Sequence, residues 1–300
     1  MNICEMTALE ISNAVKNKEI SVKDAVDAFF AAIDEYDGKY HCYNTLCKKE
    51  AYERAEEVQK GIDSGKYNGR LAGVPIGIKD NICTKDILTT CSSKILENFI
   101  PTYNATVVNR LNDEGMVIIG KLNMDEFAMG STTETSAFGV TANPWNTEHV
   151  PGGSSGGSCA AVAAGEAYMA LGSDTGGSIR QPSAFCGVTG IKPTYGTVSR
   201  YGLVAYASSL DQIGPVGKNT EDCAALLQVI AGYDPKDSTS LRRELPKSGL
   251  TSGKDLKGMR FGVPEEYMAE GMEEGVRKVF LASLKLLEEL GAEVEFFSMK

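Results

Sequence analysis

Histidine is scarce in this sequence, and long apolar runs are absent from it. The 300 residues include two histidines, His41 and His149, and one tryptophan. No stretch reaches the roughly 18 consecutive apolar residues that a transmembrane helix requires, and the N-terminus lacks the basic start and apolar core of a signal peptide. We therefore expect a cytoplasmic protein that has no membrane partner.

Basic residues are fewer than acidic residues in this sequence. Lys and Arg total 30 against 40 Asp and Glu, which gives a formal net charge of −10. Nucleic-acid binding depends on Lys and Arg side chains that neutralise phosphates. We therefore do not expect this chain to hold RNA or DNA by itself, and a partner should hold any RNA that takes part in its function.

The cysteines follow neither a metal-binding nor a disulfide pattern. There are eight of them, no two have CxxC spacing, and only two histidines could join them. This composition predicts reduced, packed thiols and no metal site. Cys159 and Cys186 lie near the glycine-rich loops discussed below, but no histidine is placed to activate either as a nucleophile.

The apolar pattern predicts an α/β protein with a mixed, mostly parallel central β-sheet covered by helices on both faces. We expect residues 1–70 to form an N-terminal helical segment packed on the core, with a capping box at Ser21 and Asp24, and residues 71–300 to form that core. The chain stops at Lys300 as a strand finishes, so we expect a core truncated at its C-terminal side.

Individual elements follow from the periodicity of apolar residues. The expected strands are 74–78, 116–119, 167–172, 259–264 and 292–297. The expected helices after residue 40 are 48–59, 105–114, 158–164, 220–231 and 273–290, and residues 234–257 are expected to form a long surface loop.

Two loops rich in glycine and serine stand out, "VPGGSSGGSC" (150–159) and "LGSDTGGSIRQP" (171–182). The first has no lysine and follows no strand, so it fits neither a Walker nor a Rossmann phosphate site. Paired glycines in the second allow several backbone N–H groups to point the same way, as an oxyanion hole requires. We predict Ser178 as a nucleophile beside an oxyanion hole formed by the backbone N–H groups of Thr175, Gly176, Gly177 and Ser178.

A serine nucleophile needs a base, and neither histidine has a promising context. Lysine can serve if burial lowers its pKa. Lys79 directly follows the apolar strand "GVPIGI", and Ser154 could relay a proton between Lys79 and Ser178. Supporting roles in the two loops are expected of Gly153, Ser155, Asp174 and Arg180. The alternative interpretations are flexible linkers for the loops and a solvated surface position for Lys79.

Three motifs, "GVPIGIKDN", "GGSSGGS" and "GSDTGGSIRQP", resemble the amidase signature family in order and spacing. The resemblance implies the amidase signature fold and a Ser-cisSer-Lys catalytic triad. In this sequence it assigns the base to Lys79, the bridging cis serine to Ser154 and the nucleophile to Ser178.

Within that family, "KLNMDEFAMGSTTETSAFG" (121–139) and residues 187–215 resemble the glutaminase subunits of tRNA-dependent amidotransferases. The resemblance implies glutamine as substrate and no cofactor in this chain. It also implies a heterotrimer with B and C subunits, in which the B subunit holds the tRNA and uses ATP and Mg²⁺ to convert Glu-tRNA(Gln) to Gln-tRNA(Gln).

The sequence is also compatible with two other functions: a free-standing amidase of the same family and a catalytically silent truncated subunit. The groups that hold the amino and carboxylate ends of glutamine are expected beyond residue 300. Asp125 and Glu126 are interpreted as surface or ion-pair groups at a helix start, near the mouth of the active site.

Overall fold

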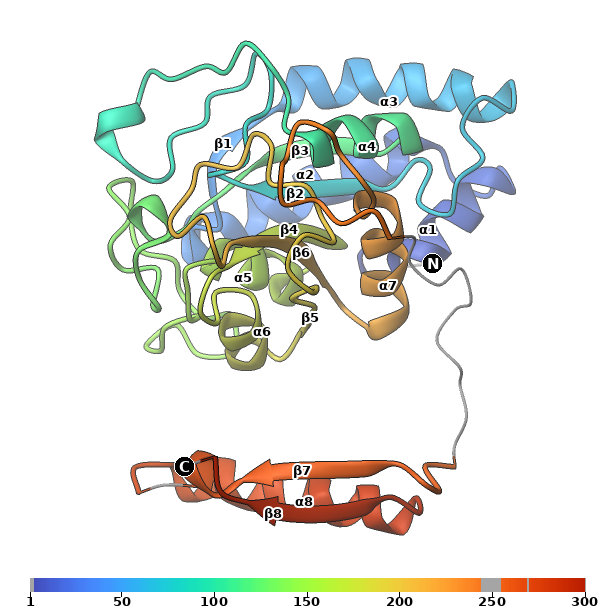
Figure 1. Ribbon diagram of the computed structural model, residues 1–300. Coiled ribbons are helices and arrows are strands. Elements are labelled where there is room, and N and C mark those ends of the chain that lie inside the picture. Colours follow the sequence, from blue (N-terminus) through green and yellow to red (C-terminus); the bar gives the residue numbers. More distant parts are fainter. Residues whose placement is uncertain (1–2, 244–254, 269, 300) are drawn as a thin grey trace. The chain divides into compact units, whose positions relative to one another are not determined.

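The computed structural model describes residues 3–243, 255–268 and 270–299 (Figure 1). The chain divides into two compact units, residues 1–247 and 248–300, so residues 1–70, predicted as a helical segment packed on the core, belong to the same unit as the central sheet. Residues of the N-terminal helices, such as Ile11 and Phe29, share one hydrophobic core with the strand residues Ile76 and Leu171. In the described part of the chain, no helix has the length and apolar character needed to cross a membrane.

The N-terminal part of the larger unit is helical, as predicted. It contains a short 3₁₀ helix, η1 (Ile3–Glu5), and the helices α1 (Ala8–Lys16), α2 (Val22–Tyr40) and α3 (Lys48–Asp63). The capping box that starts α2 is confirmed, because the Ser21 side chain accepts the N–H of Asp24 and the Asp24 carboxylate accepts the N–H of Ser21. Val26, Phe29 and Ile33 form part of the buried face of this helix.

A six-stranded mixed sheet lies at the centre of this unit, in the order β1-β3-β2-β4-β6-β5. Its strands are β1 (Tyr43–Leu46), β2 (Pro75–Lys79), β3 (Val117–Leu122), β4 (Met169–Asp174), β5 (Thr189–Gly190) and β6 (Gln212–Gly217). The predicted mixed α/β architecture is confirmed, and helices lie on both sides of the sheet in Figure 1. Strand β2 pairs in parallel with β3 and β4, while the other three pairings of the described sheet are antiparallel, so the sheet is less parallel than predicted.

The remaining helices of the larger unit connect or flank these strands. They are α4 (Thr106–Glu114), α5 (Gly156–Ala164), α6 (Arg180–Cys186) and α7 (Thr220–Ile230), with two 3₁₀ helices, η2 (Lys94–Leu96) and η3 (Glu126–Ala128). Gly165 ends α5 in the left-handed region, at φ 77°, where glycine carries no Cβ penalty.

The smaller unit contains β7 (Arg260–Pro264), η4 (Glu265–Met268), α8 (Glu274–Glu289) and β8 (Glu293–Phe297). The last two predicted strands are therefore present. They do not belong to the central sheet, so residues 71–300 do not form one core as predicted. They pair in parallel with each other in a sheet of their own. A strand pattern in the sequence predicts that a segment is extended, but it does not predict which strand that segment pairs with.

The predicted surface loop at 234–257 is only partly described, since residues 244–254 lie outside the described ranges. Its first residues are not a simple surface loop. Asp234 is buried and accepts hydrogen bonds from the hydroxyls of Ser199 (2.6 Å) and Thr106 (2.5 Å). Asp237 is also buried and forms an ion pair with Arg200 at 3.4 Å.

The sheet positions the residues that the sequence singles out. Lys79 is the last residue of β2 and Asp174 the last residue of β4. Because these strands are parallel neighbours, their carboxyl ends meet at the same edge of the sheet. Helix α5 begins at Gly156, within the first glycine-rich stretch (150–159), and α6 begins at Arg180, within the second (171–182).

Candidate active site

Lys79 is fully buried and surrounded by hydroxyl groups. Its Nζ atom lies 2.7 Å from the Oγ of Ser154, 2.9 Å from that of Ser155 and 2.9 Å from that of Ser173. Burial lowers the pKa of Lys79 to about 7, and the negative charge of Asp125 is the main influence in the opposite direction. A neutral amine is therefore available at this position near neutral pH.

The hydrogen bonds around Lys79 allow its lone pair to face Ser154 when the amine is neutral. A neutral amine has two N–H groups and one lone pair. The Ser155 hydroxyl donates to the backbone carbonyl of Ser173 at 3.1 Å, so Ser155 accepts from Lys79. The Ser173 hydroxyl oxygen accepts from Asn81 at 3.0 Å and can accept the second N–H of Lys79. The lone pair then faces Ser154, whose hydroxyl can donate its proton to Lys79.

Close packing holds the first loop beside Lys79. The backbone carbonyl of Ser154 accepts the N–H of Asp125 at 3.3 Å, and the peptide bond between Gly153 and Ser154 is cis. A Cβ atom at Gly153 would lie 2.1 Å from Asp125 Oδ2 and 2.7 Å from the Thr132 nitrogen. Only glycine allows the backbone to approach these groups so closely.

Asp174 organises the second loop. Its buried carboxylate accepts the N–H groups of Gly177 at 2.8 Å and Ile179 at 3.0 Å, and the guanidinium of Arg180 at 3.0 and 3.1 Å. Burial acts to raise the pKa of Asp174, but Arg180 and the two backbone N–H groups outweigh it and hold that pKa at about 2. Asp174 is therefore a carboxylate throughout the physiological pH range, and it fixes the turn that carries Ser178.

Ser178 is half-buried, and its backbone joins the two loops. The Ser178 carbonyl accepts the N–H of Ser155 at 3.1 Å. Among the contacts of the described residues, no hydrogen bond links the Ser178 hydroxyl to Ser154 or Lys79. The structure thus brings Lys79 and Ser154 into direct contact and Ser178 into the adjoining loop, and the nucleophilic role of Ser178 remains a prediction.

The four predicted oxyanion donors are not equivalent. The N–H of Gly177 is already donated to Asp174, so in this conformation it is occupied within the loop. Thr175, Gly176 and Ser178 remain predicted donors. Gly176 is exposed, and a Cβ atom built there would meet nothing within 4 Å.

Three residues around Lys79 were not predicted as parts of its surroundings. Ser173 lies inside the apolar run of β4, where a small polar residue gives little signal. Asn81 follows Lys79 by two positions and could have been found by its place after the strand. Asp125 was interpreted as a surface or ion-pair group at a helix start: it does precede η3, but it is fully buried, so the surface interpretation is wrong.

Among the described residues, the histidines and cysteines do not take part in the hydrogen bonds around Lys79. His149 is exposed, and the His41 ring lies 2.8 Å from the Phe138 carbonyl oxygen. All eight cysteines are free thiols, as predicted. Burial raises the pKa of Cys159 to about 12 and that of Cys186 still further, so neither forms a thiolate at neutral pH.

Two other features of the described residues lie outside the predicted site. Asp37, Cys42 and Glu166 place three possible metal-ligand atoms within 4.8 Å of one another. Burial and the neighbouring Asp37 raise the pKa of Glu166 to about 9, so that carboxyl group is protonated at neutral pH.

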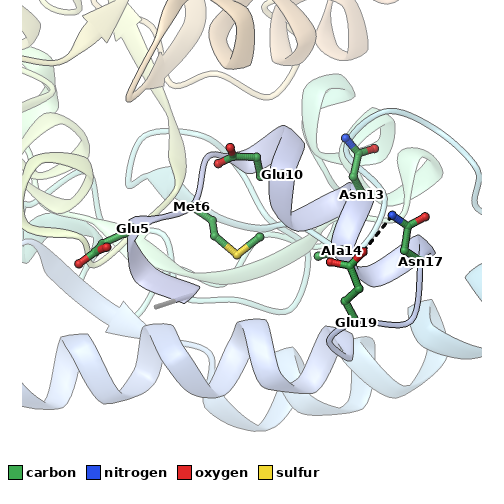
Figure 2. A pocket seen from close by; sticks show the side chains of 7 residues that line it. All are labelled: Glu5, Met6, Glu10, Asn13, Ala14, Asn17 and Glu19. Carbon is green, nitrogen blue, oxygen red and sulfur yellow. Dashed lines mark hydrogen bonds between the residues drawn. The ribbon is translucent and has the colours of Figure 1, made fainter. Parts of the chain in front are cut away.

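Figure 2 shows the second feature, a hollow of about 420 Å³. No residue of the two glycine-rich loops belongs to its lining, which is made of Glu5, Met6, Glu10, Asn13, Ala14, Asn17 and Glu19.

Comparison with known proteins identifies the family to which the chain belongs. The model of the Amidase family matches residues 24–300. The chain belongs to the amidase signature family. The family resemblance seen in the three motifs is thereby confirmed, and so is the fold that it implied.

Within the family, curated relatives show which members the chain resembles. The chain is 59% identical over 299 residues to the A subunit of glutamyl-tRNA(Gln) amidotransferase from Agathobacter rectalis, an alignment that covers 100% of this chain and 59% of the relative. It is 59% identical over 301 residues to the same protein of Lachnoclostridium phytofermentans, with coverage of 100% and 61%. The chain thus spans about three fifths of the length of these curated relatives.

Solved structures of the family are similar throughout the chain. The crystal structure of the A subunit of glutamyl-tRNA(Gln) amidotransferase from Thermotoga maritima matches with a TM-score of 0.86 and 43% identity, over 99% of this chain and 62% of that one. Native peptide amidase from Stenotrophomonas maltophilia matches with a TM-score of 0.87 and 31% identity, over 98% and 62%.

Proposed function

We propose that this chain is the glutaminase component of a tRNA-dependent amidotransferase, in which Lys79, Ser154 and Ser178 form a Ser-cisSer-Lys triad. The observation that carries the proposal is the 2.7 Å contact between the buried Lys79 amine and the Ser154 hydroxyl. The identity of 59% to the A subunits of glutamyl-tRNA(Gln) amidotransferases supports the choice of glutamine over other amides.

In the proposed acylation, Ser178 Oγ attacks the side-chain amide carbon of glutamine. The Ser178 proton passes to Ser154 Oγ as the Ser154 proton passes to Lys79 Nζ, so Lys79 becomes an ammonium. Backbone N–H groups of Thr175, Gly176 and Ser178 would stabilise the negative oxygen of the tetrahedral intermediate.

Collapse of this intermediate breaks the C–N bond. The leaving nitrogen takes a proton from Lys79 through Ser154 and departs as ammonia, which leaves a glutamyl ester on Ser178. Water then attacks the ester with the same relay as base. The products are glutamate and ammonia, and the triad returns to its starting protonation.

The proposed fate of the ammonia requires partners. A B subunit would hold the tRNA and use ATP and Mg²⁺ to phosphorylate the γ-carboxylate of tRNA-bound glutamate. Ammonia would then displace phosphate to give Gln-tRNA(Gln). A small C subunit would complete a heterotrimer that works in the cytoplasm. The net charge of −10 on this chain agrees with tRNA binding by another subunit.

Ammonia release tests the proposal. L-glutamine and a panel of simple amides would be supplied to this chain alone, and then together with B and C subunits, ATP, Mg²⁺ and Glu-tRNA(Gln), with Ser178→Ala as the control. The proposal predicts glutamine hydrolysis that rises with the partners and depends on Ser178. Broad amide hydrolysis that is indifferent to partners would indicate a free-standing amidase, and no release under any condition would indicate a catalytically silent subunit.

A further inference from the structure

Asp125 is a buried carboxylate that is only half satisfied by hydrogen bonds. It follows β3 and is fully buried. Its Oδ1 accepts the hydroxyl of Thr135 at 3.0 Å, whereas its Oδ2 is buried without a hydrogen-bond partner. A buried anionic oxygen with no donor is costly unless a positive charge lies nearby.

The free oxygen of Asp125 lies against the loop that carries the relay serine. The N–H of Asp125 donates to the carbonyl of Ser154, and a Cβ atom at Gly153 would lie 2.1 Å from Asp125 Oδ2. The hydroxyl of the same Ser154 contacts Lys79 Nζ. The Asp125 backbone therefore contacts the residue whose hydroxyl contacts Lys79, and the Asp125 carboxylate lies against the preceding residue, Gly153.

Four acidic groups act on Lys79: Asp125, Cys159, Asp174 and Cys91. All but Asp125 are neutral or already paired. Burial raises the pKa of Cys159 and of Cys91 to about 12, so both stay protonated at neutral pH. Asp174 is paired with Arg180. Asp125 is the member of this group whose negative charge is not paired with a cation in direct contact.

We infer that Asp125 is a positioning residue whose charge stabilises the Lys79 ammonium formed when the proton of Ser178 arrives through Ser154. The inference rests on the proposed relay for its proton path. Asp125 raises the basicity of Lys79 through its charge and is not itself a proton donor or acceptor in the relay. A lysine with no such carboxylate would be a weaker base, because burial alone disfavours its charged form.

The pH dependence of Ser178 labelling by a fluorophosphonate tests this inference without any substrate. In that reaction the Ser178 Oγ–P bond forms, fluoride leaves, and the serine proton ends on Lys79. In the unaltered chain the labelling rate should rise with pH around a midpoint near 7, where Lys79 loses its proton. In Asp125→Asn the midpoint should fall by about 1 pH unit, and the maximal rate should fall by at most about tenfold as the base weakens.

Two controls separate charge from structure. Glu126→Gln removes the same charge from the neighbouring residue and should leave the midpoint unchanged. Thr135→Val removes the hydrogen bond to Asp125 but keeps its carboxyl group, and it should lower the midpoint by less than Asp125→Asn does. If Asp125→Asn does not fold, Asp125→Ser is a smaller variant that also removes the charge and should lower the midpoint in the same direction.

An unchanged midpoint in a folded, charge-free Asp125 variant would overturn the inference, and so would an equal fall in Glu126→Gln. Failure of the proposed function would look different. Lys79→Ala would then be labelled as fast as the unaltered chain, whatever residue stands at position 125.

Discussion

Lys79 on β2 and Lys121 on β3 are both fully buried in neighbouring strands, yet their surroundings differ in kind. Lys121 Nζ lies 3.7 Å from Asp80 Oδ1 and donates to the Thr89 hydroxyl at 2.6 Å. Among the described residues, Lys79 has no carboxylate at contact distance, and its side-chain partners are three serine hydroxyls. Lys121 is thus held as one half of an ion pair, whereas Lys79 is free to gain and lose a proton.

Stability should depend on pH through Lys79. Its pKa is about 7 in the folded chain and about 10.4 when unfolded, so between these values the unfolded state binds more protons. The free energy of unfolding should therefore rise with pH across this window, by up to about 1.4 kcal/mol per pH unit, and this contribution is lost as pH falls to 7.

Urea denaturation at pH 7, 8 and 9 would measure that slope against Lys79→Met, in which it should be reduced. The exposed Lys49→Met should keep the slope of the unaltered chain. Equal slopes in all three proteins would show that Lys79 is not a titrating group in this range.

Alanine should be tolerated at one glycine of the two loops and rejected at another. A Cβ atom at Gly153 would lie 2.1 Å from Asp125 Oδ2, and one at Gly176 would meet nothing within 4 Å. Gly153→Ala should therefore destabilise the chain by about 1–3 kcal/mol and reduce fluorophosphonate labelling at least tenfold. Gly176→Ala should match the unaltered chain in both measurements, and similar behaviour of the two variants would contradict the tight packing at Gly153.

Asp174→Asn should disrupt the turn that carries Ser178. The substitution replaces a carboxylate that accepts two backbone N–H groups and pairs with the Arg180 guanidinium. Breaking such a pair with one partner buried should cost about 3 kcal/mol and slow labelling of Ser178. Arg180→Met should cost less, because the Arg180 side chain is 54% exposed and the backbone bonds to Asp174 remain. A larger loss in Arg180→Met, measured by urea denaturation, would reverse this ranking.

His149 should be dispensable. It is exposed, and its backbone N–H donates to the Asn146 carbonyl while its carbonyl accepts the N–H of Asn143. His149→Ala should keep ammonia release within a few-fold of the unaltered chain. A loss on the order of a thousandfold, as expected for removal of a catalytic base, would favour a Ser–His mechanism instead.

The sequence predicted elements well where apolar residues are continuous. Strands β2, β3 and β4 follow such runs, and Ser21 with Asp24 marks the start of α2. Strand β6 was missed because "QIGPVG" (212–217) contains two glycines and a proline, which weaken a strand prediction. The separate pairing of β7 with β8 could not be predicted, since pairing partners depend on tertiary contacts.

In the candidate site, too, the features that depend on tertiary packing could not be predicted from the sequence. Motif order identified Lys79 and Ser154, and their contact is now observed. The burial of Asp125 and the hydroxyl of Ser173 depend on how loops pack over the sheet edge, and a local pattern does not encode that packing. The engagement of Gly177 by Asp174 likewise depends on the exact path of the turn.

The central claim is that Lys79, through Ser154, activates Ser178, and the most direct measurement is mass spectrometric mapping of fluorophosphonate adducts on the unaltered chain, Lys79→Ala and Ser178→Ala. The account predicts an adduct on the Ser178 peptide of the unaltered chain and none in either variant. An adduct on Ser178 that forms at an undiminished rate in folded Lys79→Ala, or one on another residue, would contradict it.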